Sequence, residues 1–159
     1  AFNVKAEQTF EKKELKKYAD CEYRVMFSGD LSQLPKTTQN AIKKGVDASK
    51  GNDGIMVNIA LNYGSRQEIV KAVNTILQSG IREVDEQMIE DCLYTAGLPP
   101  LDVVVRSSGE KRLSNFMLWQ SAYSELIFID KYWPDFDEAT LDEILLEYSN
   151  RDRRFGGIK

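Results

Sequence analysis

The chain has 159 residues, with 21 Lys and Arg against 25 Asp and Glu, a net charge of −4 and no histidine. This length predicts one domain with a core of its own, and the missing histidine excludes a Ser-His-Asp triad, a Cys-His pair and a His-ligated zinc site. The acidic balance disfavours a general nucleic-acid binder, which is usually basic.

The first half of the chain predicts alternating helices and strands. Residues 7–19 are strongly charged and indicate a solvated helix. A short strand is expected over 23–27 and a helix over 36–49. The apolar run 55–61 is typical of a strand covered on both faces. The next helix carries its apolar side chains on one stripe, made of Ile69, Val73, Ile76 and Leu77.

The second half continues the same alternation. Its predicted elements are a helix from Asp85 to Gly97, a strand over 101–105, a helix over 115–124, a strand over 126–129 and a helix over about 138–149. Strands that alternate with helices of this length indicate βαβ units. We therefore expect an α/β fold, with a parallel β-sheet and helices on both faces.

The two cysteines, Cys21 and Cys92, are isolated and form no CxxC pair. Two cysteines do not make a disulfide framework in a chain of this size, so a reducing compartment is favoured. No stretch approaches about 18 consecutive apolar residues, and no signal peptide is recognised. We predict a cytoplasmic protein without a transmembrane helix.

Ligands of parallel sheets bind beyond the carboxyl ends of the strands, so the loops after the predicted strands are candidate sites. Three such loops cover residues 28–30, 62–66 and 106–115. The third is the most informative, because Arg106 closes an apolar strand, where a cation is costly without an anionic partner. Small residues follow it, and they allow close approach to the backbone.

Residues 106–112 carry three positive charges and one negative charge. Guanidinium groups match phosphate oxygens bidentately. Ser114 and Asn115 lie where the helix over 115–124 is expected to start, and either residue can cap it. Free amides at a helix start favour an anion. Two interpretations stay open, namely a phosphate site and a loop whose Arg residues pair with nearby carboxylates.

Two further features are ambiguous. Glu125 lies near the end of the helix predicted over 115–124. Considered by itself it is expected to be a surface residue, whereas beside a diphosphate it could hold Mg²⁺. The segment 151–157 carries three Arg against one Asp. It is either a solvated basic tail, a partner contact or a second anion contact.

Residues 102–125, DVVVRSSGEKRLSNFMLWQSAYSE, closely resemble the signature of the cis-prenyltransferases, the undecaprenyl and related polyprenyl diphosphate synthases. Three further blocks are similar to the family's blocks and stand in the family's order. They are residues 27–35, residues 58–70, and residues 133–136 followed by 153–157. The resemblance runs from about residue 20 to the end of the chain.

The resemblance implies a reaction and its partners. The family condenses isopentenyl diphosphate in cis onto an allylic diphosphate primer such as farnesyl diphosphate, and the product is a Z-polyprenyl diphosphate. The implied cofactor is Mg²⁺, and the implied assembly is a homodimer or heterodimer with a hydrophobic product tunnel between sheet and helices. No nucleic acid is expected, and the lipid product gives a reason for peripheral contact with a membrane.

The resemblance also assigns roles to residues of this chain. Arg106, Arg112 and Ser114 would hold the diphosphate of isopentenyl diphosphate, and Glu125 would help to hold Mg²⁺. Supporting roles fall to Asn62, Arg66 and Gly156. Gly156 belongs to the C-terminal Arg-Phe-Gly segment, which would approach the substrate site across the dimer interface.

Two N-terminal blocks of the family are not found in this sequence. One is a strand ending in Asp-Gly-Asn-x-x-Arg, which binds the primer diphosphate and supplies the essential Asp. The other is a Ser/Thr-Glu-Asn-Trp-like run, unless residues 1–3 are its remnant. The chain thus resembles the C-terminal two-thirds of the fold, as a single domain over 1–159 that lacks the N-terminal strands. Three hypotheses remain: a cis-prenyltransferase, a non-catalytic or truncated homologue with the isopentenyl diphosphate half-site and dimer surface, and an unrelated phosphate-binding module.

Overall fold

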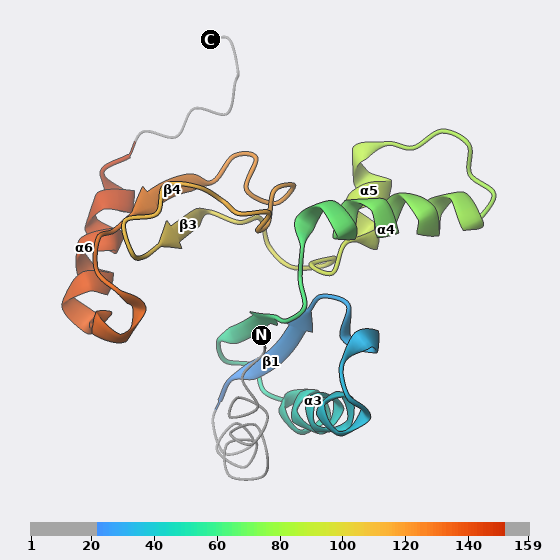
Figure 1. Ribbon diagram of the computed structural model, residues 1–159, viewed down its shortest axis with the longest axis horizontal. Helices are drawn as coiled ribbons and strands as arrows, with labels where there is room; N and C mark the ends of the chain where they lie inside the picture. Colours follow the sequence, from blue (N-terminus) through green and yellow to red (C-terminus); the bar gives the residue numbers. More distant parts are fainter. Residues whose placement is uncertain (1–21, 152–159) are drawn as a thin grey trace. The chain divides into compact units, whose positions relative to one another are not determined.

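The computed structural model describes residues 22–151, and the chain divides into two compact units, Ala1–Ala96 and Gly97–Lys159 (Figure 1). Each unit is described by itself. The helix expected over 7–19, Cys21 and Gly156 lie outside the described residues. So does the basic segment after Arg151.

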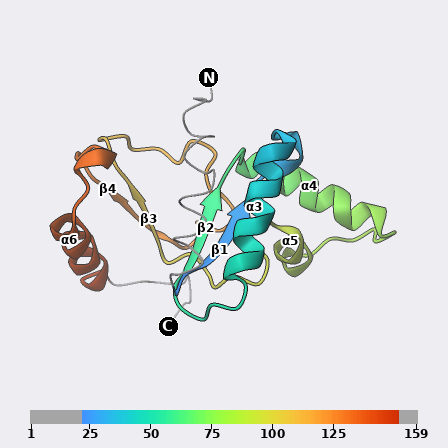
Figure 2. The same ribbon diagram turned by 90° about the horizontal axis from the view of Figure 1, so that it is seen from below.

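The first unit is built around two parallel strands joined through a helix. Its elements are β1 Arg24–Ser28, the 3₁₀ helix η1 Leu31–Gln33, α3 Lys36–Ser49, β2 Met56–Ala60, α4 Ser65–Gln78 and α5 Glu86–Cys92. In the parallel pair, Arg24 lies opposite Met56 and Ser28 lies opposite Ala60. Figure 2 shows α3 beside this pair of strands. The expected parallel βαβ arrangement is confirmed.

Helix α3 packs on β1 through a buried stripe. Ile42, Gly45 and Ser49 are its buried residues, and they recur at the spacing of one helical face. The hydroxyl of Ser49 accepts a hydrogen bond from the backbone N–H of Val25 at 3.0 Å and donates to the carbonyl of Gly45 at 3.0 Å. A buried polar group is thereby satisfied at the contact between helix and strand.

Two expectations for this unit are corrected. Met56 and Val57 of β2 are exposed, so the described residues do not cover both faces of this strand. Helix α5 begins as expected after Asp85, whose carboxylate accepts from the N–H of Met88 at 2.8 Å. It ends at Cys92 and not near Gly97, because Leu93 has extended backbone angles.

The second unit repeats the parallel pairing. Its elements are β3 Val103–Arg106, β4 Glu125–Phe128, the 3₁₀ helix η2 Trp133–Asp135 and α6 Glu138–Ser149. Val103 lies opposite Glu125, and Arg106 lies opposite Phe128. The buried apolar side chains of this unit come from both strands, the connection between them and α6: Val104, Met117, Ile127 and Ile144.

The helix expected over 115–124 is wrong, because the connection from β3 to β4 consists of turns. Ser114, Asn115 and Met117 have φ values of +48°, +64° and +47°. These angles belong to the left-handed region, which a right-handed helix cannot contain. Hydrogen bonds of turns replace those of a helix. For example, the N–H of Phe116 donates to the carbonyl of Leu113 at 2.9 Å.

Candidate functional site

Three of the predicted site residues meet at the carboxyl end of β3. Arg106 is the last residue of that strand, and its Nη1 donates to Oγ of Ser114 at 2.8 Å and to the backbone carbonyl of Arg112. One guanidinium group therefore closes the loop from residue 106 to residue 114. The expected grouping of Arg106, Arg112 and Ser114 is present in the fold.

Glu110 supplies the anionic partner inside this loop. Its Oε2 forms an ion pair with Nη1 of Arg112 and lies 4.0 Å from Nη2 of Arg106. The side chains of Arg106 and Arg112 are 28% and 63% exposed, so both cations remain accessible. Two guanidinium groups share one carboxylate, which leaves the loop positively charged and suited to an added anion.

The turn in this loop has no free amides at Ser108 and Gly109. The N–H of Ser108 donates to the carbonyl of Lys131 at 2.8 Å, and the N–H of Gly109 donates to that of Ile129 at 2.9 Å. These two amides are therefore already engaged and are not available to an anion.

Ser114 and Asn115 do not cap a helix. Both residues have positive φ, and no helix follows them. Ser114 instead accepts a hydrogen bond from Arg106. The argument from a positive helix end consequently fails here, and the hydroxyl of Ser114 serves to orient a guanidinium group.

Glu125 lies away from this loop within its own unit. It is the first residue of β4 and pairs with Val103, whereas Arg106 pairs with Phe128. The three intervening steps separate the two residues by about 10 Å along the strands. The structure therefore does not bring Glu125 beside Arg106 of the same chain.

The carboxylate of Glu125 is bound by Arg151. Nη1 of Arg151 lies 3.0 Å from Oε2 of Glu125, and Nη2 of the same residue binds Glu147. The hydrogen bond to Glu147 is the main cause that raises the pKa of Arg151, and the bond to Glu125 adds to it. Arg151 belongs to the second basic cluster and holds two carboxylates.

Carboxylates that could hold Mg²⁺ are sparse in this arrangement. Among residues 22–151 no group of three or more His, Cys, Asp or Glu side chains could hold a metal ion. Mg²⁺ is often bound through one or two carboxylates together with substrate phosphates and water. Glu125 would supply one such carboxylate, which Arg151 binds in this structure.

The first unit places Asn62 at the carboxyl end of its own strand pair. Asn62 has φ +48°, and its Nδ2 donates to the carbonyl of Asp30 at 2.8 Å. The N–H of Asp30 donates in return to the carbonyl of Asn62 at 3.2 Å. These reciprocal bonds join the loops after β1 and β2. The hydroxyl of Ser32 holds the pKa of Asp30 below its ordinary value, with help from Gln33.

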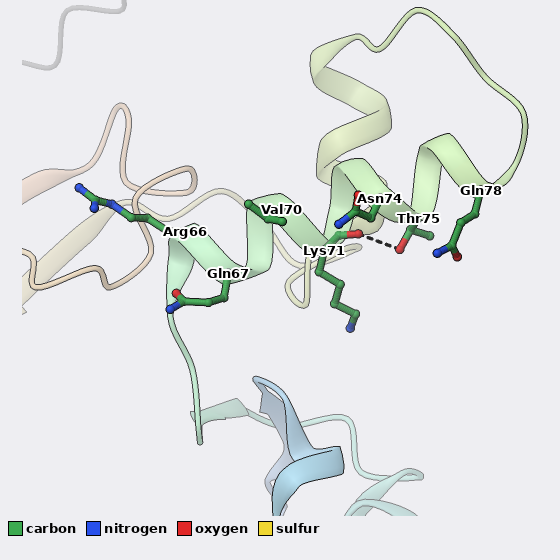
Figure 3. A pocket seen from close by; sticks show the side chains of 7 residues that line it. All are labelled: Arg66, Gln67, Val70, Lys71, Asn74, Thr75 and Gln78. Atoms are coloured by element: carbon green, nitrogen blue, oxygen red, sulfur yellow. Dashed lines mark hydrogen bonds between the residues drawn. The ribbon is translucent and has the colours of Figure 1, made fainter.

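Arg66 is the second residue of α4 and lies at one end of a shallow groove of about 640 Å³ along that helix. Figure 3 shows its side chain pointing away from the rest of the lining. The lining is polar apart from one residue and consists of Arg66, Gln67, Val70, Lys71, Asn74, Thr75 and Gln78.

Glu68 is a buried carboxylate that the sequence analysis did not single out. Its Oε2 accepts from the hydroxyl of Tyr63 at 2.5 Å, and its Oε1 accepts from the N–H of Tyr94 at 2.8 Å. It fastens the loop that contains Asn62 to α4 and to the segment after α5. Its spacing of four and eight residues from the buried Ala72 and Ile76 would have marked it as inward-facing.

Similarity to known proteins identifies the family of this chain. The family model described as "Putative undecaprenyl diphosphate synthase" matches residues 2–156. The chain belongs to this family. The resemblance to cis-prenyltransferases that the sequence motifs indicated is therefore confirmed.

Curated relatives within the family are close in sequence. The isoprenyl transferase of Oceanobacillus iheyensis is 48% identical over 141 residues, covering 85% of this chain and 56% of that protein. A ditrans,polycis-undecaprenyl-diphosphate synthase ((2E,6E)-farnesyl-diphosphate specific) of Lactiplantibacillus plantarum is 44% identical over 144 residues, again covering 85% and 56%. The chain spans a little over half the length of these relatives.

Solved structures of similar proteins support the α/β fold. A probable undecaprenyl diphosphate synthase from Campylobacter jejuni has a TM-score of 0.85 and 31% identity, covering 96% of this chain and 71% of that chain. Lavandulyl diphosphate synthase from Lavandula x intermedia, in complex with dimethylallyl diphosphate, has a TM-score of 0.79 and 32% identity, covering 94% and 75%. In the part of this chain that the structure describes, no helix is long and apolar enough to cross a membrane.

Proposed function

We propose that this chain binds isopentenyl diphosphate and provides the isopentenyl diphosphate half of a cis-prenyl transfer site. The observation that carries the proposal is the convergence of Arg106, Arg112 and Ser114 at the carboxyl end of β3. Family membership supports it, because relatives are named as isoprenyl transferases and undecaprenyl diphosphate synthases. The reaction joins isopentenyl diphosphate to an allylic primer, for which farnesyl diphosphate is our candidate.

The side chains have defined tasks in this proposal. Arg106 and Arg112 neutralise and orient the diphosphate, and Ser114 keeps the guanidinium group of Arg106 in place. The incoming phosphate oxygens compete with Glu110 for both cations. Mg²⁺ held through Glu125 would supply further neutralisation of diphosphate charge.

Because Glu125 and Arg106 lie at opposite ends of their strands, we propose that two copies complete the site. The working assembly is a homodimer, and Gly156 would approach the diphosphate of the partner copy. Asn62 and Arg66 would act as supporting residues. We further propose a single cytoplasmic domain, equivalent to the C-terminal two-thirds of the family fold, that contacts membranes peripherally through its lipid product.

Replacing Arg106 tests the binding proposal. In Arg106→Ala the affinity for isopentenyl diphosphate should fall roughly tenfold to a hundredfold, since a charge-assisted bond to phosphate contributes about 1.5–3 kcal/mol. Isothermal titration calorimetry measures this change. Arg82→Ala, at an exposed position of the first unit, is the matched control and should bind like the parent chain. Equal affinities for the parent chain and Arg106→Ala would contradict the proposal.

The second candidate is a non-catalytic subunit that keeps the fold and this half-site. The 159 residues contain no Asp-Gly-Asn-x-x-Arg block, so elongation of a primer by this chain has to be assayed directly. Incubation with radiolabelled isopentenyl diphosphate, farnesyl diphosphate and Mg²⁺ separates the two candidates, because only the enzyme elongates the primer.

A separate titration with inorganic pyrophosphate tests a general phosphate-binding module. Such a module should bind pyrophosphate and isopentenyl diphosphate equally well.

A further inference from the structure

The side chain of Lys131 is anchored at the first turn of α6. Its Nζ donates to Oγ1 of Thr140 at 2.6 Å and lies 3.2 Å from Oδ1 of Asp137. Thr140 is only 2% exposed, and both its N–H and its hydroxyl donate to the carboxylate of Asp137. The hydroxyl thus gives its proton to Asp137 and offers a lone pair to Lys131. The ammonium group therefore makes two of its three possible hydrogen bonds to the start of α6.

The backbone of the same residue supports the turn in the 106–112 loop. The carbonyl of Lys131 accepts the N–H of Ser108 at 2.8 Å, and the carbonyl of Ile129 accepts that of Gly109 at 2.9 Å. Ser108 has φ +70°, a conformation that costs free energy in a residue with a side chain. These two bonds hold the strained turn in place.

The turn stands between the two cations of the proposed site. Arg106 precedes it, Arg112 follows it, and the carbonyl of Arg106 accepts the N–H of Ile129 at 2.9 Å. Moving residues 129–131 would therefore move the first part of the loop, from Arg106 to Gly109, and with it the chain that leads to Arg112. A displacement of about 1 Å can cost a binding or catalytic site as much as a hundredfold.

We propose that Lys131 is a positioning residue for the diphosphate-binding loop, fixed through its side chain by Thr140 and Asp137. It acts on Arg106 and Arg112 through the Ser108–Gly109 turn and does not touch the ligand. The ligand part of this inference rests on the proposed function, whereas the support of the turn does not. A purely structural role for Lys131 would lower the stability of α6 and leave the turn and the ligand affinity unchanged.

Amide hydrogen exchange, followed by NMR in the full chain, tests the support of the turn. In Lys131→Met the amides of Ser108 and Gly109 should exchange about tenfold faster, because the carbonyls that hold them become mobile. Lys36→Met is the matched control, since Nζ of Lys36 donates to Gln39 of its own helix, α3, at 3.2 Å. Unchanged exchange at both amides in Lys131→Met would overturn the inference.

Titration with isopentenyl diphosphate tests the ligand part. The dissociation constant should rise about tenfold in Lys131→Met, return close to the parent value in Lys131→Arg and stay unchanged in Lys36→Met. Thr140→Val, which keeps the side-chain shape and removes the hydroxyl, should behave like Lys131→Met. Faster exchange with an unchanged dissociation constant would overturn the role in binding. A parent chain that does not bind isopentenyl diphosphate would overturn the proposed function, and the exchange rates would then decide the support of the turn alone.

Discussion

At the scale of single residues, Gly29 shows how closely the backbone is packed next to Asn62. It has φ +138°, and a Cβ atom there would lie 2.0 Å from the carbonyl oxygen of Leu61. The N–H of Leu61 in turn donates to the carbonyl of Ser28 at 2.9 Å. The loops after β1 and β2 can approach this closely only because residue 29 has no side chain.

Gly29→Ala is expected to destabilise the chain by about 3 kcal/mol, since the methyl group meets backbone and the conformation is strained. Urea unfolding, monitored by circular dichroism, measures the change in free energy. Gly51→Ala is the control, because a Cβ there meets nothing within 4 Å. It should change stability by less than about 0.5 kcal/mol. Equal effects of the two substitutions would contradict this explanation.

At the scale of elements, the start of α6 depends on a charged cap. Asp137 accepts hydrogen bonds from the hydroxyl and the N–H of Thr140 and from Lys131. These bonds, with that from the Thr140 hydroxyl the largest, lower the pKa of Asp137 from 3.8 to about 2. A lowered carboxyl pKa means that the folded state favours the ionised form.

The stability that Asp137 contributes should therefore depend on pH. It is fully present above pH 3.8, the ordinary pKa, and is lost as the pH falls through about 2. Asp137→Asn keeps a capping side chain and removes the charge. Its melting temperature should lie below that of the parent chain at neutral pH, with the difference closing as the pH falls from 4 towards 2. A difference that stays constant over this range would exclude the charged cap as its cause.

At the scale of the whole molecule, apolar side chains remain uncovered on α6. Leu141, Leu145 and Leu146 are exposed there, among the residues that the structure describes. Their spacing places Leu141 and Leu145 one turn apart on the same side of the helix. Exposed apolar side chains that gather on one element favour association with further protein.

We accordingly expect a homodimer in solution. Sedimentation velocity should give twice the chain mass of 18.1 kDa, with the monomer appearing only on dilution. Mass action makes this concentration dependence a necessary consequence of a reversible dimer. A species of single-chain mass at every concentration tested would contradict the proposed two-copy site.

Local patterns in the sequence were sufficient for most elements and for the proximity of Arg106, Arg112 and Ser114. The apolar runs at 55–61 and 101–105 predicted strands, and the parallel pairing was confirmed. Both predictions depend on neighbouring residues alone, since period and turn chemistry are local properties. The grouping of Arg106 with Arg112 and Ser114 was likewise available, because all three lie in one short loop.

Contacts between distant residues decided the rest. The turns over 115–124, the engaged amides of Ser108 and Gly109 and the anchoring of Lys131 by Thr140 all depend on partners that sequence spacing does not reveal. Glu125 illustrates the reason most clearly, because its register against Val103 determines which end of the sheet it occupies. Strand register and backbone hydrogen bonding are properties of the folded chain, so only the tertiary structure assigns them.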